Sequence, residues 1–210
     1  MTAREGRTGG TEGARLFLVR HGRSEGNRPE GTLLGRGDPP LTDAGMEEAD
    51  AAASLLARRL RPGARLYASP LARARDSARR LGDRLGLPVR LAAALVELDM
   101  GRLEGRLWSD VPAERARWDA DPGRYRFPGG EGLDDVARRA EAWFGENVAG
   151  QPGDTVVVAH LFVILALTAR ILRLPLDEIL RLHLEHGGVV ELRLSPAGGR
   201  LHGLYPGRLA

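Results

Sequence analysis

The feature that most constrains this chain is a regular alternation of short apolar runs with longer segments of helical periodicity. The strand-length runs are residues 15–20, 65–68 and 155–159, and the helical segments are residues 42–60, 70–86, 133–148 and 161–172. Strands that alternate with helices in this way are typical of α/β domains, in which helices cover a largely parallel sheet. We therefore expect a single three-layer α/β domain with a mostly parallel central sheet flanked by helices.

Local signals predict where several elements begin and end. Thr42 is suited to cap one helix, and Ser69 is suited to cap the next, with Pro70 at the first helical position. Two apolar runs, residues 189–194 and 201–204, are separated by a Pro-Ala-Gly-Gly segment. These runs predict a closing β-hairpin.

Residues 99–130 interrupt the alternation. Prolines divide this stretch into short pieces, and between them stand the aromatic residues Trp108, Trp118, Tyr125 and Phe127. Long excursions of this kind in compact domains are often lids or substrate walls. We expect a helical and irregular insertion that folds over the active site at one end of the sheet.

The length of 210 residues suits one domain. Residues 1–14 are polar and rich in glycine, so we interpret them as a disordered tail before a domain at residues 15–210. They lack the apolar segment of a signal peptide, and the longest apolar run, residues 161–167, is much shorter than a membrane span. These features predict a soluble cytoplasmic protein with no membrane partner.

Composition excludes several classes of site and partner. The chain has no cysteine, so it forms no disulfide and no thiolate metal site. All 31 basic side chains are arginine, and the net charge is only +3. Acidic residues are interspersed with these arginines, whereas a nucleic-acid-binding surface is usually clustered and unbalanced. We expect no nucleic-acid partner.

The sequence Arg20-His21-Gly22 stands directly at the end of the first predicted strand. Ligands of open α/β sheets bind outside the carboxyl ends of the strands. An arginine offers a planar fork to phosphate oxygens, an imidazole can attack phosphorus, and a glycine lets the backbone approach a ligand closely. The pattern indicates a phosphate site, although a surface turn that contains a histidine explains the tripeptide alone equally well.

Two further groups could join this site. Arg73 lies in the first turn of a predicted helix, whose N-terminus also favours an anion. His160 ends the valine-rich strand at residues 155–159, as His21 ends the first strand. If the two strands are neighbours in the sheet, both histidines belong to one site. Taken singly, Arg73 is also explained as an exposed helix residue and His160 as a structural histidine.

A general acid is predicted among the carboxyl groups near the start of the insertion. Glu97 is flanked by apolar residues, so we expect burial to raise its pKa, as a general acid needs. Asp99 and Glu104 compete for the same role on composition alone. The residues themselves leave this choice open.

Taken together, these motifs resemble those of the histidine phosphatase (phosphoglycerate mutase-like) superfamily, in its phosphatase branch. The resemblance spans nearly the whole chain and depends on the order of the motifs. They are Leu18-Val19-Arg20-His21-Gly22-Arg23-Ser24 with Asn27, Gly37-Asp38-Pro39-Pro40-Leu41-Thr42 with Gly45, Ser69-Pro70-Leu71 with Arg73 and Ala74, Glu97 with Gly101, Glu104 and Gly105, Phe127-Pro128-Gly129-Gly130-Glu131, and His160.

The resemblance implies a metal-independent phosphomonoester hydrolase that acts through a phosphohistidine on a small phosphorylated metabolite. His21 is then the phosphorylated residue, and Glu97 is the proton donor. The residues implied to bind the phosphoryl group are Arg20, Arg73 and His160, with Asn27 and Ser24 lining the phosphate or substrate pocket. No cofactor is implied, because two arginines and a protonated histidine can supply the charge stabilisation that phosphoryl transfer needs.

Two positions depart from the family pattern. Leu161 stands where glycine usually follows the second histidine, and Gly132 stands where serine is usual. Both departures alter the expected shape of the pocket. We assign Leu161 to substrate specificity, with packing in the core as the alternative.

Two other functions are compatible with parts of this pattern, a phosphoglycerate mutase and a non-catalytic phosphate-binding module. A phosphoglycerate mutase usually has a longer insertion between the equivalents of Glu97 and His160, so we favour the phosphatase. A non-catalytic phosphate-binding module is expected to have lost a central side chain, and His21, Arg73, Glu97 and His160 are all present. The sequence does not name the substrate, and it leaves a homodimer open.

One pair of histidines has a spacing that could suit a metal ion. His183 and His186 are three residues apart and could share a helix face, but Gly187 and Gly188 follow at once. Neither His21 nor His160 has a recognisable metal-ligand spacing with another residue. We therefore expect no bound metal.

Overall fold

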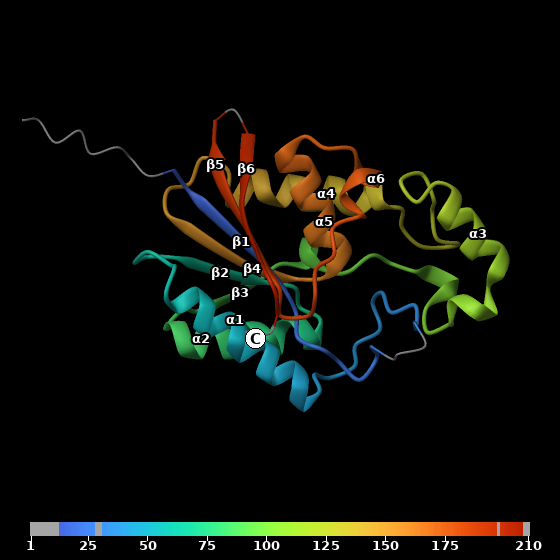
Figure 1. Ribbon diagram of the computed structural model, residues 1–210, viewed down its shortest axis with the longest axis horizontal. Coiled ribbons are helices and arrows are strands. Elements are labelled where there is room, and N and C mark those ends of the chain that lie inside the picture. The colour runs from blue at the N-terminus through green and yellow to red at the C-terminus, as the bar shows by residue number, and fades with distance from the viewer. Residues whose placement is uncertain (1–12, 28–30, 197, 208–210) are drawn as a thin grey trace, which may run out of the picture.

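The computed structural model describes residues 13–27, 31–196 and 198–207 (Figure 1). The disordered tail predicted for residues 1–14 falls outside the described residues, apart from Gly13 and Ala14. Within the described part of the chain, one six-stranded sheet is covered by helices on both faces. The predicted α/β fold class is confirmed.

The sheet has the strand order β3-β2-β4-β1-β5-β6. Its strands are β1 (Arg15–Arg20), β2 (Arg65–Ala68), β3 (Val89–Leu91), β4 (Asp154–Ala159), β5 (Val189–Ser195) and β6 (Gly198–Tyr205). The first four are mutually parallel, whereas β5 and β6 are antiparallel and form the predicted hairpin at one edge. In the centre β1 pairs with β4, in a register that sets Arg20 beside Ala159. The residues that follow these two strands therefore emerge at the same end of the sheet.

Helices form the two outer layers. Those on one face are α1 (Asp43–Ala57) and α2 (Ala72–Leu85), and those on the other are α4 (Leu133–Asn147) and α5 (Leu161–Leu172). Successive strand side chains point to opposite faces. Phe17 of β1 packs with α1 and α2, whereas its neighbours Leu16 and Leu18 pack with α4 and α5. The apolar run that predicted β1 thus fills two cores at once.

The predicted insertion at residues 99–130 forms several short pieces. They are the 3₁₀ turns η2 (Gly101–Leu103) and η3 (Trp108–Asp110) and the helix α3 (Pro112–Ala120), while η1 (Ala93–Leu95) precedes the insertion and α6 (Leu176–Ile179) follows α5. Figure 1 shows α3 standing to one side of the sheet. A β-bridge between Thr32 and Leu107 joins the insertion to the loop that follows β1. Both segments therefore lie beyond the carboxyl end of β1.

One of the two predicted helix caps is wrong. Thr42 caps α1 as expected, with its hydroxyl accepting the Gly45 N–H. Ser69 does not cap α2, which begins at Ala72 after Leu71 as its N-cap. The Ser69 hydroxyl lies instead 2.8 Å from Nε2 of His160 on the neighbouring strand. A contact between strand ends has replaced the local cap.

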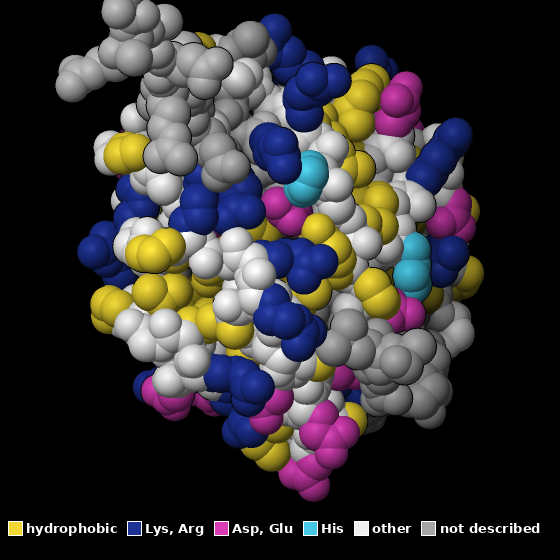
Figure 2. Space-filling view, turned by 60° about the vertical axis from the view of Figure 1, so that its left-hand side comes forward, with side chains coloured by type: hydrophobic (Ala, Val, Ile, Leu, Met, Phe, Trp, Pro, Cys, Tyr) yellow, Lys and Arg dark blue, Asp and Glu magenta, His cyan; other side chains and the backbone are white. Residues whose placement is uncertain are grey.

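His183 and His186 do not share a helix face. The segment between α6 and β5 that carries them is irregular, because the helical turn ends at Ile179. Arginine side chains are spread over the face in Figure 2, with acidic and apolar side chains between them. In the described ranges, no helix combines the length and the apolar character that a membrane span requires.

Candidate active site

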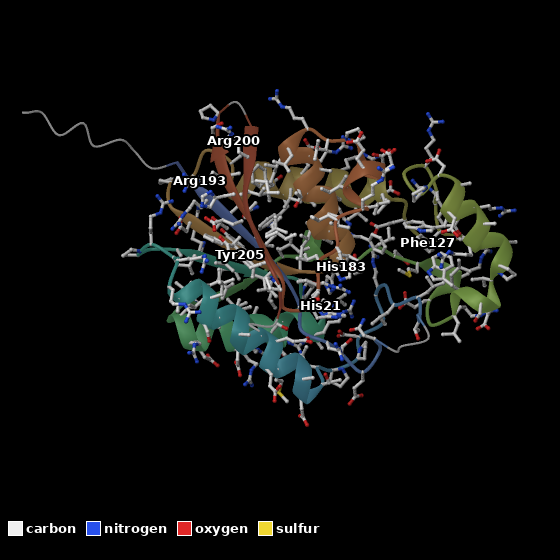
Figure 3. The ribbon with its side chains drawn as sticks, viewed as in Figure 1. His21, Phe127, His183, Arg193, Arg200 and Tyr205 are labelled. Atoms are coloured by element: carbon white, nitrogen blue, oxygen red, sulfur yellow. The ribbon has the colours of Figure 1, made fainter. Side chains whose placement is uncertain are left out.

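The histidines that follow β1 and β4 meet at one end of the sheet. Because these strands are parallel neighbours, the ring centroids of His21 and His160 are 5.0 Å apart. Only 4% of His21 and 0% of His160 is exposed. Figure 3 shows His21 near the end of β1, below the start of α5. The prediction that neighbouring strands would bring both histidines together is confirmed.

A cleft of about 200 Å³ opens beside His21. Six residues of the predicted site line it, and they are Arg20, His21, Asn27, Arg73, Glu97 and Leu161. The loop after β1, the insertion and the first turn of α5 supply the rest of the lining. This active-site cleft lies where ligands of open α/β sheets usually bind.

Hydrogen bonds orient the His21 ring. Nδ1 lies 2.7 Å from the Gly22 carbonyl oxygen, which can only accept, so Nδ1 carries the proton and Nε2 keeps its lone pair. Burial, and then the charge of Arg73, lowers the pKa of His21 well below its usual value. The ring is therefore neutral near pH 7, and Nε2 can act as a nucleophile.

The glycine after His21 serves packing between backbones rather than the predicted ligand contact. A Cβ atom at Gly22 would lie 1.9 Å from the carbonyl oxygen of Gly45 in α1. The Gly22 N–H donates to Ser77 Oγ in α2 at 3.0 Å. The residue thus fixes the nucleophile against two helices.

Arg73 lies in the first turn of α2 and is 1% exposed. Its Nε is 3.3 Å from His21 Nε2, while Nη1 and Nη2 donate to the carbonyls of Gly37 and Gly35 at 2.6 and 2.7 Å. These bonds hold the guanidinium against the nucleophilic nitrogen. A phosphoryl group on Nε2 would form beside a fixed positive charge.

Glu104 holds the loop that holds Arg73. Its carboxylate accepts the backbone N–H groups of Gly35, Arg36 and Gly37 at 2.9–3.2 Å. These three backbone donors occupy the carboxylate, and Glu104 is not among the described residues that line the cleft. The geometry therefore assigns Glu104 to structure rather than to acid catalysis.

Glu97 is the competing carboxyl group that lines the cleft. It is 5% exposed and accepts the N–H of Leu98 at 2.8 Å and, more weakly, that of Phe162 at 3.5 Å. Burial raises the pKa of Glu97 against the opposing effect of these bonds and of nearby arginines. The third candidate, Asp99, instead forms an ion pair with Arg36 at 3.1 Å. The geometry favours Glu97 as the general acid.

The Phe-Pro-Gly-Gly-Glu motif supports the segment that carries Glu97. Glu131, the last residue of the motif, accepts the Asp99 N–H at 3.1 Å and pairs with Arg139 of α4 at 3.0 Å. Arg139 in turn donates to the carbonyls of Ala94 and Glu97 at 2.6 and 3.1 Å. No sequence motif singled out Arg139, because two of its partners are backbone carbonyls more than 40 residues away.

Arg20 keeps donors available beside the nucleophile. Its Nη1 donates to the Leu184 carbonyl at 2.6 Å, while its Nε is buried and has no hydrogen-bond partner among the described residues. Burial lowers the pKa of Arg20, but a guanidinium stays protonated at neutral pH. The unused N–H can meet an oxygen of a bound phosphoryl group.

His160 is completely buried and is not among the described residues that line the cleft. The Ser69 hydroxyl lies 2.8 Å from Nε2 of His160, within hydrogen-bond distance. Nδ1 of His160 has no hydrogen-bond partner within the described part of the chain. Burial, followed by the proximity of His21 and Arg73, lowers the pKa of His160 well below its usual value. The unliganded residue is therefore neutral, whereas the resemblance implied a protonated one. An incoming phosphoryl dianion would favour its protonation.

Ser24 and Asn27 form one unit at the rim. The Ser24 hydroxyl donates to Asn27 Oδ1 at 2.8 Å, and the Ser24 N–H donates to the same oxygen at 3.0 Å. Asn27 lines the cleft, so Ser24 orients its amide. A direct contact between Ser24 and phosphate stays a prediction.

The two departures from the family pattern lie in different places. Leu161 lines the cleft and also packs, half-buried, against the hydrophobic core. Its position is therefore compatible both with the predicted role in substrate specificity and with the alternative role in core packing. Gly132 is the N-cap of α4, where its N–H donates to Asp135 at 2.9 Å. It is not among the described residues that line the cleft. We expect the pocket's shape to depend on Leu161 rather than on Gly132.

His186 is a neighbour of the nucleophile that the sequence suggested only as a metal ligand. Its ring centroid lies 5.4 Å from that of His21. Burial, and then the charge of Arg20, lowers the pKa of His186 to about 3. Among the residues that the structure describes, no three His, Asp or Glu side chains are grouped to hold a metal ion.

Comparison with known proteins gives one consistent family. The model of the histidine phosphatase superfamily (branch 1) matches residues 16–205. A glucosyl-3-phosphoglycerate phosphatase of Mycolicibacterium vanbaalenii is 39% identical over 179 residues, which cover 78% of this chain and 76% of the relative. A putative phosphoserine phosphatase 2 of Hydrogenobacter thermophilus is 27% identical over 187 residues, or 86% of this chain and 90% of that protein. The native structure of a mycobacterial glucosyl-3-phosphoglycerate phosphatase superposes with a TM-score of 0.81 at 30% identity, covering 91% of this chain and 98% of that one.

Proposed function

The chain belongs to the histidine phosphatase superfamily (branch 1), and from this membership we propose that it hydrolyses a small phosphomonoester through a phosphohistidine at His21. The observation that carries the proposal is the contact between His21 Nε2 and Arg73 in a cleft that also holds the protonatable Glu97. A nucleophile, a fixed cation and an acid thus converge on one small space.

In the first step His21 Nε2 attacks phosphorus, and the bond from phosphorus to the ester oxygen breaks. Arg20, Arg73 and His160 surround the phosphoryl oxygens and stabilise the charge that spreads over them in the transition state. Glu97 gives its proton to the departing alkoxide, which leaves as an alcohol.

In the second step the now ionised Glu97 takes a proton from a water molecule. The resulting oxygen nucleophile attacks phosphorus, the phosphorus–nitrogen bond breaks, and inorganic phosphate is released. His21 returns to its neutral form and Glu97 to its protonated form, so the site is ready for another cycle. The same carboxyl group serves as acid and then as base because it lies beside both the leaving oxygen and its replacement.

Rapid quenching with a ³²P-labelled ester tests this mechanism. We expect an acid-labile, base-stable phosphoenzyme in the unmodified protein and none in His21→Ala, with phosphate release lost in the variant. Arg75→Ala, on the exposed side of α2 near Arg73, is the matched control and should retain labelling. Retained activity of His21→Ala would refute the proposal.

Two further experiments test for a mutase and for a metal requirement. Transfer of label to a second phosphoglycerate position, without phosphate release, would identify a mutase. Dialysis against a chelator should leave the rate unchanged, and activity that is lost on dialysis and restored by a divalent metal would contradict the metal-independent mechanism.

A further inference from the structure

The insertion and the start of α5 give the cleft an aromatic wall, which consists of Trp108, Trp118, Phe127 and Phe162. Figure 3 shows Phe127 on the side of the insertion, away from the strand end that carries His21. The wall therefore faces the part of a substrate that lies beyond the phosphoryl group. It is the leaving group that meets these rings.

Trp118 lies at the centre of the aromatic wall. Its ring centroids are 5.6 Å from Phe127, 5.7 Å from Phe162 and 6.2 Å from Trp108, all within the range of favourable aromatic pairs. Phe127 is 1% exposed, whereas the other three rings are only partly buried. They leave apolar surface uncovered inside a cleft, which is typical of a ligand-binding surface.

Charge restricts what can occupy this space. Among the described lining residues the cations are Arg20 and Arg73, and both adjoin His21, where the phosphoryl group needs them. The other polar lining residues in those ranges, Asn27 and Thr32, are uncharged, apart from the acid Glu97. The Arg115 guanidinium lies 5.4 Å from the centroid of the Trp108 ring but is not among the described residues that line the cleft. A carboxylate inside the cleft would therefore meet rings rather than a cation on the described wall, and burying an unpaired charge is costly.

The volume of the cleft also bears on the size of the leaving group. The cleft measures about 200 Å³, below the roughly 300–1,000 Å³ of pockets for drug-sized ligands. An apolar cavity of about 150 Å³ is known to hold a benzene molecule. A phosphoryl group with one ring fills such a space, whereas a nucleotide or a disaccharide would extend beyond the wall.

We propose that this phosphatase selects phosphomonoesters whose leaving alcohol carries one uncharged aromatic ring, and that the ring packs against the aromatic wall. The inference rests on the proposed function, since the reaction is the hydrolysis described above, with release of an arylmethanol and phosphate. Phe162 places the aromatic wall next to the proton donor, because its backbone N–H contacts the Glu97 carboxyl group at 3.5 Å while its ring lies in the wall.

A set of alkyl phosphates tests the selection without changing the chemistry. Benzyl phosphate, glycerol 3-phosphate and 3-phosphoglycerate all release primary alkoxides that need protonation by Glu97. We expect kcat/KM for benzyl phosphate to exceed the other two by about 10- to 100-fold, mainly through KM, from the burial of one ring in aromatic contact. An equal or higher kcat/KM for 3-phosphoglycerate or for glucosyl-3-phosphoglycerate would overturn the inference.

Variants locate the preference in the wall. Trp118→Leu and Phe162→Leu should each reduce the ratio of kcat/KM for benzyl phosphate to that for glycerol 3-phosphate by about tenfold. Trp118→Phe should restore part of the ratio, and Arg117→Ala, at a neighbouring α3 position with 69% of its side chain exposed, should keep all of it. A ratio unchanged in folded Trp118→Leu, as judged by circular dichroism, would overturn the assignment.

The two proposals fail in different ways. If no ester releases phosphate, p-nitrophenyl phosphate included, the proposed phosphatase function fails. If p-nitrophenyl phosphate is hydrolysed through His21 but benzyl phosphate is not preferred, only the inference about the leaving group fails.

Discussion

At the scale of single residues, the environment of the Glu97 carboxyl group favours its neutral form. It is buried between the aromatic wall and the arginines, and burial raises its pKa. A protonated carboxyl group is useful only while the leaving oxygen needs a proton. Its contribution to the rate should therefore depend on the leaving group.

Replacing Glu97 with glutamine should separate these cases. For benzyl phosphate, whose alkoxide is a poor leaving group, Glu97→Gln should lower kcat by roughly 10²–10⁴-fold. For p-nitrophenyl phosphate the loss should be much smaller, because the phenolate departs without a proton. Steady-state kinetics of both esters measure the difference.

The same assay on Asp99→Asn provides the control. Asp99 forms an ion pair with Arg36 and should affect both substrates alike. Equal losses for both esters in Glu97→Gln would indicate a structural role and return Asp99 to consideration as the acid.

The sequence predicted the candidate site residues that the structure brings together, but not the residues that orient them. The motif order indicated His21, Arg73 and His160, because their positions at strand and helix ends are local. The choice between Glu97 and its competitors required the fold, since Glu104 is engaged by a loop 67–69 residues away in the chain. Sequence spacing carries no signal for such partners.

At the scale of elements, α5 begins at Leu161, directly after the second histidine. The tight passage from β4 into α5 leaves this side chain between the cleft and the core. One position thus adjoins both the cleft and the core. A change there should affect two measurable properties at once.

Leu161→Gly should widen the cleft and weaken the core. We expect bulkier esters, such as naphthylmethyl phosphate, to gain in kcat/KM relative to benzyl phosphate. Loss of a half-buried leucine at the start of a helix should lower the free energy of unfolding by about 1–3 kcal/mol. Substrate profiles and urea denaturation measure the two effects.

The volume-conserving Leu161→Met is the control and should change neither property much. A destabilised Leu161→Gly with an unchanged substrate profile would assign the leucine to the core alone.

Element boundaries were predictable where the signal is local. Thr42 caps α1 through its own first turn, so its role could be predicted from the sequence. Ser69 carries an equally good cap signal, but its hydroxyl contacts His160 from another strand. The competing partner lies 91 residues away, beyond the reach of any local rule.

At the scale of the whole molecule, Asp154 joins three segments that are distant in sequence. Its fully buried carboxylate pairs with Arg15 at the start of β1 and with Arg61 after α1, each at 2.6 Å. Burial alone would raise the pKa of Asp154, but hydrogen bonds from the two arginines outweigh that effect and lower it. This cluster lies at the opposite end of β1 and β4 from the histidines.

Asp154→Asn should destabilise the protein by about 2–4 kcal/mol. The estimate is at the lower end for a buried pair because 17% and 27% of the Arg15 and Arg61 side chains are exposed. In the unmodified protein the contribution is present above the ordinary aspartate pKa of about 3.9 and is lost as pH falls through the lower folded-state value. Urea denaturation between pH 7 and acid pH tests both statements.

The exposed pair of Asp119 and Arg115 provides the control. About half of each side chain is exposed, and Asp119→Asn should cost less than about 1 kcal/mol. A similar loss of unfolding free energy in both variants would show that the buried cluster stabilises the protein no more than the exposed pair does.

The class of the fold followed from the sequence, but the order of its strands did not. Alternation of apolar runs with helical segments indicated which residues form strands and helices. It carried no information on which strands become neighbours, and β1 pairs with β4 and β5, both far along the chain. That pairing brings the two histidines together.

The central position of β1 also affects how the protein is made. During synthesis β1 leaves the ribosome well before β4, since Arg15 and Asp154 are separated by 139 residues. Until β4 and β5 follow, the nascent chain carries an apolar strand with two unpaired edges, a state that invites aggregation. The nucleophile acquires its surroundings only after these strands have been translated. A nascent chain that lacks β4 and β5 therefore cannot assemble the site around His21.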